Sequence, residues 1–227
     1  KKIKMDRKRT ILVIGDIILD KYIQGKVERI SPEAPVPVIL FQKESCLLGG
    51  ASNVARNIAS FGGNVTLIGR IGNDEDGKII IKKCKESKID SNQLIKDRNL
   101  PTTNKTRYVN KGQQLFRLDK EELLPIKEDQ EEQVIEFLNS GLEQIEVVIL
   151  SDYNKGFLTL SLTKKIIKVC NEFGIKVLID PKKKDFNSYK GAFLLTPNEK
   201  EAENATGIKI VDEVSLLQCF EKLVNQT

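Results

Sequence analysis

The chain has 227 residues, 40% of them hydrophobic and 30% charged, which is enough apolar material for one sizeable core. Its 37 Lys and Arg residues against 32 Asp and Glu residues give a net charge of +5, without a basic stripe carrying interleaved aromatic side chains, so nucleic acid is not an expected partner. The sequence contains no histidine, which excludes Ser-His-Asp and Cys-His catalysis and every histidine-ligated metal site. A general base would therefore have to be a carboxylate, Lys, Tyr or Cys.

The cysteines and the apolar runs indicate a reducing, aqueous compartment. The four cysteines are far apart and form no C-x-x-C pair, which is typical of small buried side chains in a reducing environment. No apolar run approaches the roughly 18 residues needed to span a bilayer, and the basic segment 1–9 is not followed by a signal-type apolar stretch. We expect a soluble cytoplasmic protein with no membrane partner, in which segment 1–9 is a solvated terminus rather than a nucleic-acid arm.

Short apolar, β-branched runs alternate with stretches of helical period along most of the chain. The runs at 10–15, 65–71, 147–150, 176–179 and 192–195 predict strands, and those of helical period at 51–60, 76–87, 126–142, 158–173 and 212–224 predict helices. This alternation predicts βαβ units, a parallel sheet and an α/β fold of the three-layer α/β/α sandwich type. In such a fold the last helix should feed another strand, so we expect the domain spanning 1–227 to be C-terminally incomplete.

Two stretches, 17–42 and 105–119, break this alternation. The first carries strand-like residues around a proline-rich segment, and the second carries two strand-like runs on either side of Asn110-Lys-Gly-Gln, a hairpin signal. Strands outside the alternation predict a small sheet apart from the sandwich. We interpret it as a β-sheet lid over the strand ends, where open α/β folds bind ligands; a plain structural hairpin is the alternative.

Polar residues near the first predicted strand are candidates for sugar binding. Asp16 and Asp20 lie at and just beyond the strand end, where a carboxylate can accept hydrogen bonds from vicinal hydroxyls, although a cap or turn role is equally open. Gly49 and Gly50 precede a predicted helix and permit close approach of a ligand. Asn53 both donates and accepts, which suits a hydroxyl, but a glycine pair before a helix is more often only a turn.

Three later predicted strands also end in polar residues, in segments 151–156, 180–182 and 196–201. Lysine neutralises phosphate charge, and Asn and Glu bind or orient a hydrated magnesium ion. Three such ends in succession predict a phosphate site, and it is not of the P-loop type because no G-x-x-x-x-G-K-[ST] is present.

Particular motifs carry a family resemblance. Gly49-Gly-Ala-Ser-Asn-Val-Ala55 resembles the first signature of the ribokinase-like (PfkB) carbohydrate kinases, and Asn198-Glu-Lys-Glu201 is similar to their N-x-x-E motif for magnesium and nucleotide phosphates. Segments 15–22, 29–38, 113–119, 151–156 and 178–182 resemble the members of this family that phosphorylate heptose 7-phosphate on the way to ADP-heptose. Ile30-Ser-Pro-Glu-Ala-Pro-Val-Pro37 is the most specific of these stretches, and the resemblance extends over nearly the whole chain from Ile11.

The resemblance implies an activity and a set of site residues. A member of this group moves the γ-phosphate of ATP to the anomeric hydroxyl of D-glycero-D-manno-heptose 7-phosphate and gives the 1,7-bisphosphate, a step towards the lipopolysaccharide core. Motif matching implies that the sugar-binding residues are Asp16, Asp20, Gly49, Gly50, Asn53, Lys105, Arg107, Arg117 and Asp152. Of these, Lys105, Arg107 and Arg117 are candidates to hold the 7-phosphate. The residues expected to serve ATP are Lys155, Lys182, Asn198, Glu199, Lys200 and Glu201, and Glu201 is expected to hold Mg²⁺ through water. A homodimer through the lid strands and an adenylyltransferase partner, fused or separate, are also implied.

One part of the family pattern is missing. The glycine-rich D-T-x-G-A-G-D signature, which supplies the anion hole and the catalytic base, does not occur in the sequence. We therefore expect no catalytic residue in this chain, place the base Asp beyond Thr227, and expect residues 1–227 alone to be nearly inactive. Other sugar or sugar-phosphate kinases of the fold, and a non-catalytic sugar- or nucleotide-binding relative, remain alternatives. A Rossmann dehydrogenase is disfavoured because no G-x-G-x-x-G follows the first strand.

Overall fold

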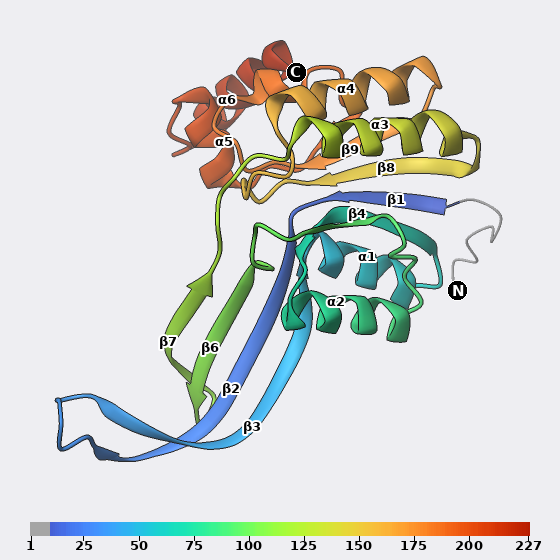
Figure 1. Ribbon diagram of the computed structural model, residues 1–227. Coiled ribbons are helices and arrows are strands. Elements are labelled where there is room, and N and C mark those ends of the chain that lie inside the picture. Colours follow the sequence, from blue (N-terminus) through green and yellow to red (C-terminus); the bar gives the residue numbers. More distant parts are fainter. Residues whose placement is uncertain (1–9) are drawn as a thin grey trace.

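The computed structural model describes residues 10–227, which form a three-layer α/β/α sandwich with a second sheet projecting from one end (Figure 1). The predicted fold class is therefore confirmed. The basic segment 1–9 lies outside the described residues, so its expected solvated state stays a prediction.

The central sheet has six parallel strands in the order β10-β9-β8-β1-β4-β5. In chain order these are β1 (Thr10–Gly15), β4 (Asn64–Gly72), β5 (Leu94–Asp97), β8 (Ile145–Ser151), β9 (Lys176–Asp180) and β10 (Leu194–Leu195). The sequence analysis missed β5, because four residues with a lysine and an aspartate among them carry little strand signal.

Helices cover both faces of this sheet. The helices α1 (Ala51–Ser60) and α2 (Glu75–Glu86) pack on one face, and α3 (Glu128–Gly141) and α4 (Leu160–Glu172) pack on the other (Figure 1). Four more helices follow α3 in the chain. They are the short 3-10 helices η1 (Leu142–Gln144) and η2 (Phe186–Tyr189) and the α-helices α5 (Glu199–Thr206) and α6 (Glu213–Gln226).

The middle strand shows why the apolar runs are continuous. In β1, Leu12 and Ile14 face the core under α3 and α4, whereas Val13 faces the core over α1 and α2, and all three side chains are fully buried. A strand covered on both faces needs apolar residues at every position rather than at alternate ones.

The second sheet has four strands in the order β3-β2-β6-β7. They are β2 (Ile17–Ile30), β3 (Pro37–Gly50), β6 (Asn104–Asn110) and β7 (Gln113–Lys120), with β2 and β6 parallel and the other neighbours antiparallel. The predicted lid segment 17–42 was wrong at its end, because β3 stays paired with β2 as far as Ile17 and so runs on to Gly50. The strands predicted within 105–119 extend one residue further at each end. The sheet begins where β1 ends, so it stands beside the carboxyl ends of the central strands (Figure 1).

Two features of the structure concern the expected reducing compartment and the expected lack of a membrane span. Cys84, Cys170 and Cys219 are buried free thiols as expected, but Cys46 on β3 is only partly buried, because the lid sheet has little covering it there. Within residues 10–227, no helix has both the length and the apolar character that a membrane span requires.

Candidate active site

The carboxyl ends of β1, β8 and β9 lie side by side, because Gly15 pairs with Ser151 and Ser151 pairs with Asp180. From β1 the chain proceeds to β4 and β5 on one side and then returns to β8 on the other side. Open α/β sheets bind ligands at such a reversal of strand order. The structure therefore brings Asp16 and Asp152, which follow β1 and β8, to the position where a ligand is expected.

Asp16 is buried and anchors the loop that follows β8. Its Oδ2 accepts backbone N–H bonds from Tyr153 (2.8 Å) and Lys155 (3.1 Å), and its Oδ1 accepts one from Phe157 (3.2 Å). Burial raises the pKa of Asp16, and the charge of Asp152 adds to this; the backbone bonds offset the rise only in part. Asp16 thus has the turn-stabilising role that was one of its two predicted alternatives, and its carboxylate also lines a cavity.

This cavity, of about 20 Å³, lies at the strand ends and is lined by Asp16, Arg70, Glu122 and Lys155 among others. Arg70 was missed by the sequence analysis, because an arginine near a strand end matches no motif. It donates to the backbone carbonyl oxygens of Leu124 and Pro125, and burial lowers its pKa. With this polar lining and small volume, the cavity has room only for water-sized groups while the lid keeps this position.

The glycine pair permits close packing where β3 enters α1. A Cβ at Gly50, whose φ is 55°, would collide with the carbonyl oxygen of Asp16. A Cβ at Gly49 would collide with the carboxylate of Asp20 on β2. Gly50 is thus required by the fold, whereas a side chain at Gly49 would displace the carboxylate of Asp20.

The first turn of α1 lies beside this glycine pair, and the N–H of its first residue, Ala51, donates to the carbonyl oxygen of Asp16 (2.9 Å). Gly50 is the N-cap and supplies no side-chain hydrogen bond to the first turn. Asn53 lies in that turn, and its Oδ1 accepts a bond from Arg56 (2.7 Å), which leaves its amide N–H groups for a ligand.

The basic residues predicted on the lid all pair with carboxylates. Lys105 Nζ lies 3.1 Å from Asp119, and Arg117 binds both oxygens of the same carboxylate at 2.7 and 2.9 Å. Arg107 binds Asp20 at 2.6 Å, so the predicted sugar ligand Asp20 already has a cationic partner. Burial opposes ionisation of Asp119, but its bonds to Arg117 and Lys105 outweigh burial and lower its pKa.

Asp152 is the centre of a buried polar cluster. Its Oδ2 accepts from Lys183 Nζ and from Tyr189 Oη (2.8 Å), and its Oδ1 accepts from the backbone N–H of Asn154 (2.8 Å). Burial and the adjacent carboxylate raise the pKa of Tyr189. Lys183 and Tyr189 were missed, because a run of three lysines does not tell which one points inward.

The N-x-x-E segment forms the start of α5. Asn198 Oδ1 accepts from the backbone of Glu201, and Glu201 Oε2 accepts from the backbone of Asn198, both at 2.9 Å, which is a capping box. Lys182 Nζ binds Glu201 Oε1 at 2.6 Å, while Glu199 and Lys200 are exposed. The segment therefore lies next to the end of β9, on the same edge of the sheet as Asp16 and Asp152.

Comparison with known proteins decides the family. A model described as pfkB family carbohydrate kinase matches residues 8–227. The chain belongs to this family of carbohydrate kinases. It is 42% identical over 219 residues to the bifunctional protein HldE of Aliarcobacter butzleri, which covers 96% of the chain and 46% of that relative. It is 44% identical over 216 residues to the HldE of Wolinella succinogenes, with 94% and 46% covered. The chain thus spans less than half the length of these relatives.

Solved structures agree on the fold. The chain superposes on the tetrameric inhibited form of phosphofructokinase-2 from Escherichia coli with a TM-score of 0.73 at 19% identity, covering 97% of the chain and 70% of that protein. The ribokinase of Arabidopsis thaliana complexed with ribose and ATP gives 0.70 at 18% identity, with 97% and 70% covered. The family resemblance read from the motifs is therefore confirmed, and these more distant structures support the fold alone.

Proposed function

We propose that this chain forms the sugar- and nucleotide-binding part of a kinase that transfers the γ-phosphate of ATP to the anomeric hydroxyl of D-glycero-D-manno-heptose 7-phosphate. The observation that carries the proposal is the convergence of Asp16 and Asp152 at the strand reversal, directly beside the lid sheet. Identity of 42–44% to HldE proteins over almost the whole chain supports the heptose phosphate as substrate.

On the sugar side, the proposed hydroxyl ligands are Asp16, Asp20, Gly49, Gly50, Asn53 and Asp152. A carboxylate has about four acceptor positions, so Asp16 keeps capacity for a sugar hydroxyl beside its three backbone bonds. Burial and the charge of Asp152 raise its pKa, and a hydroxyl donor would stabilise the ionised form.

The 7-phosphate is assigned to Lys105, Arg107 and Arg117. These three cations share only two carboxylates, Asp20 and Asp119, so the lid carries one surplus positive charge at this point. Guanidinium groups bind phosphate in the same bidentate manner in which Arg117 now binds Asp119, so a phosphate could replace that carboxylate as the partner.

On the nucleotide side, Lys155, Lys182 and the segment 198–201 are the proposed ATP ligands. Residues 10–227 contain no cluster of three or more side chains able to enclose a metal ion. This fits Mg²⁺, which usually keeps several waters and uses one or two carboxylates together with substrate phosphates. Glu201, through water, and Asp180 would hold it: burial and then the charge of Glu201 raise the pKa of Asp180, and a bound divalent cation would offset this repulsion. The ion would supply charge neutralisation on the phosphates.

The rest of the domain is proposed to extend beyond residues 1–227. The chain covers about 70% of the solved kinases and lacks the glycine-rich signature, so the base Asp and the anion hole are proposed to lie past Thr227. The HldE relatives are bifunctional and more than twice as long, which supports a fused adenylyltransferase.

We also propose a homodimer through the lid and a cytoplasmic location. Large apolar side chains are exposed on the lid strands, among them Ile30, Phe41, Phe116 and Leu118, and a second lid would cover them. The four described cysteines are all free, which suits a reducing compartment where ATP is available.

The proposal is tested by measuring ADP release from the full-length protein with Mg-ATP and a panel of sugars. The panel contains heptose 7-phosphate, fructose 6-phosphate, tagatose 6-phosphate and ribose. We expect kcat/KM for heptose 7-phosphate to exceed each of the others at least tenfold. A higher value for a hexose or pentose would overturn the heptose assignment, and no release with any sugar would favour a non-catalytic relative.

A further inference from the structure

Glu121, the first residue after β7, lies where the lid returns to the sandwich. Its Oε1 accepts a bond from Lys155 Nζ at 2.7 Å, and the two side chains are only 22% and 20% exposed. No motif pointed to Glu121, and it has no role in the site described so far.

The other oxygen of this carboxylate is the notable one. Glu121 Oε2 is buried and has no hydrogen-bond partner among residues 10–227. A buried acceptor without a donor destabilises the folded state, so an unsatisfied oxygen in a folded protein calls for a specific reason. A donor supplied by a ligand is one such reason.

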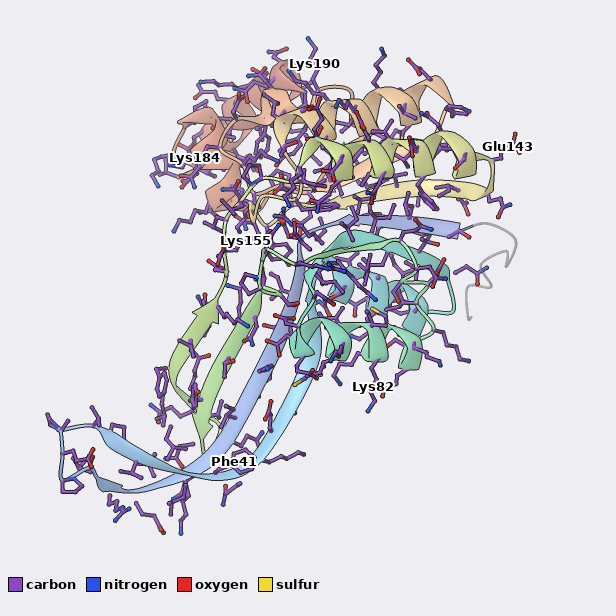
Figure 2. All side chains as sticks on the ribbon, in the orientation of Figure 1. Phe41, Lys82, Glu143, Lys155, Lys184 and Lys190 are labelled. Atoms are coloured by element: carbon purple, nitrogen blue, oxygen red, sulfur yellow. The ribbon has the colours of Figure 1, made fainter. Side chains whose placement is uncertain are left out.

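The position of Glu121 ties it to the strand-end site. Lys155, its partner, donates its backbone N–H to Asp16 at 3.1 Å. Lys155 and Glu122, the residue after Glu121, line the same cavity as Asp16. Figure 2 shows Lys155 at the junction between the lid strands and the ends of the central strands. Glu121 thus lies next to two residues that line this cavity, its ion-pair partner Lys155 and its chain neighbour Glu122, without lining it itself.

We propose that Glu121 is a further substrate-binding residue, whose Oε2 accepts a hydrogen bond from a hydroxyl of the sugar. This rests on the proposed function. A hydroxyl supplies the donor that the oxygen lacks, and a bond to an ionised acceptor is about twice as strong as a neutral one. Lys155, bound to Oε1, fixes the orientation of the carboxylate.

The test compares the full-length wild-type protein with Glu121→Ala, Glu121→Gln and the control Glu132→Gln, which changes an exposed residue of α3. In Glu121→Gln the amide oxygen faces Lys155, so the NH₂ group takes the place of the free oxygen. We expect Glu121→Gln to raise the KM for the sugar at least tenfold, leave the KM for ATP within twofold, and leave the control at wild-type values. In Glu121→Ala, which also releases Lys155, the KM for the sugar should rise at least as much. A raised KM for ATP with an unchanged KM for the sugar would mean that Glu121 only holds Lys155, which overturns the proposal. Unchanged values for both substrates would mean that water satisfies Oε2, which overturns it as well.

A binding cycle keeps the proposal testable if a variant is inactive. Calorimetry with sugar analogues that each lack one hydroxyl should identify one analogue that binds the wild type at least tenfold more weakly but loses nothing further in Glu121→Gln. Equal losses in both proteins for every analogue would refute the contact. If the wild type prefers a different sugar, the heptose assignment fails, and the same comparison made with that sugar still tests Glu121.

Discussion

Replacing Asp16 by alanine tests the anchoring of the loop after β8. The change removes the acceptor of three backbone N–H groups, of which that of Phe157 is buried and those of Tyr153 and Lys155 are partly buried. A buried unsatisfied donor costs about 1–3 kcal/mol, and water can replace the bond only at the two partly buried sites. Relief of the buried charge offsets part of this cost. We expect the free energy of unfolding to fall by about 3 kcal/mol.

Scanning calorimetry and urea unfolding of the full-length protein measure this loss. Asp129→Ala is the matched control, because Asp129 is an exposed aspartate in the first turn of α3 and its removal should cost less than about 1 kcal/mol. The Asp16→Ala variant should also lose kcat/KM, because the loop carrying Asp152 and Lys155 is no longer fixed. A variant with wild-type stability that loses only sugar affinity would refute the anchoring role and leave Asp16 as a ligand alone.

Three further substitutions test other parts of the account. Gly50→Ala should lower the free energy of unfolding in urea by about 2 kcal/mol or more, since φ is 55° and the new Cβ meets the carbonyl of Asp16. Gly112→Ala, at φ 84° with open space around it, should lower it by less. Equal losses in the two variants would contradict the packing argument. Burial opposes ionisation of Glu131, but hydrogen bonds from side chains around the start of α4 outweigh burial and hold the pKa of Glu131 below the usual 4.5. The ionised carboxylate therefore stabilises the fold above that pH, and this contribution is lost as the pH falls through the lowered pKa. Glu131→Gln should therefore be less stable by about 2 kcal/mol at pH 7, with the gap closing in acid; a gap constant from pH 7 to pH 3 would show that the charge is not involved. Arg117→Met should raise the KM for the heptose phosphate about tenfold or more and leave that for the unphosphorylated heptose unchanged, and an equal rise for both sugars would remove the phosphate assignment.

The central sheet was predictable because its strands are covered on both faces. Val13 and Leu12 point to opposite cores, so residues 11–14 are all apolar and stand out in the sequence. The start of α1 was predicted at the correct residue, because the glycine pair marks the place where β3 ends. The predicted ends of β1, β8 and β9 placed Asp16, Asp152 and Lys182 on one edge of the sheet.

The remaining features depend on contacts between distant parts of the chain. Leu19 of β2 pairs with Asn104 of β6, and no local pattern announces a parallel pairing across so long a separation. Lys183 rather than Lys182 reaches Asp152, because η2 places Tyr189 under that carboxylate and sets the path of the lysine run. The roles of such residues follow only from the folded arrangement.

The most direct measurement of the central claim is ³¹P NMR of the full-length protein with heptose 7-phosphate and Mg-ATP. We predict a new resonance coupled to the anomeric proton, in equal amount to the ADP formed, while the 7-phosphate signal persists. ADP formation without an anomeric phosphate, or loss of the 7-phosphate signal, would contradict the assignment of the strand-end site to anomeric phosphoryl transfer.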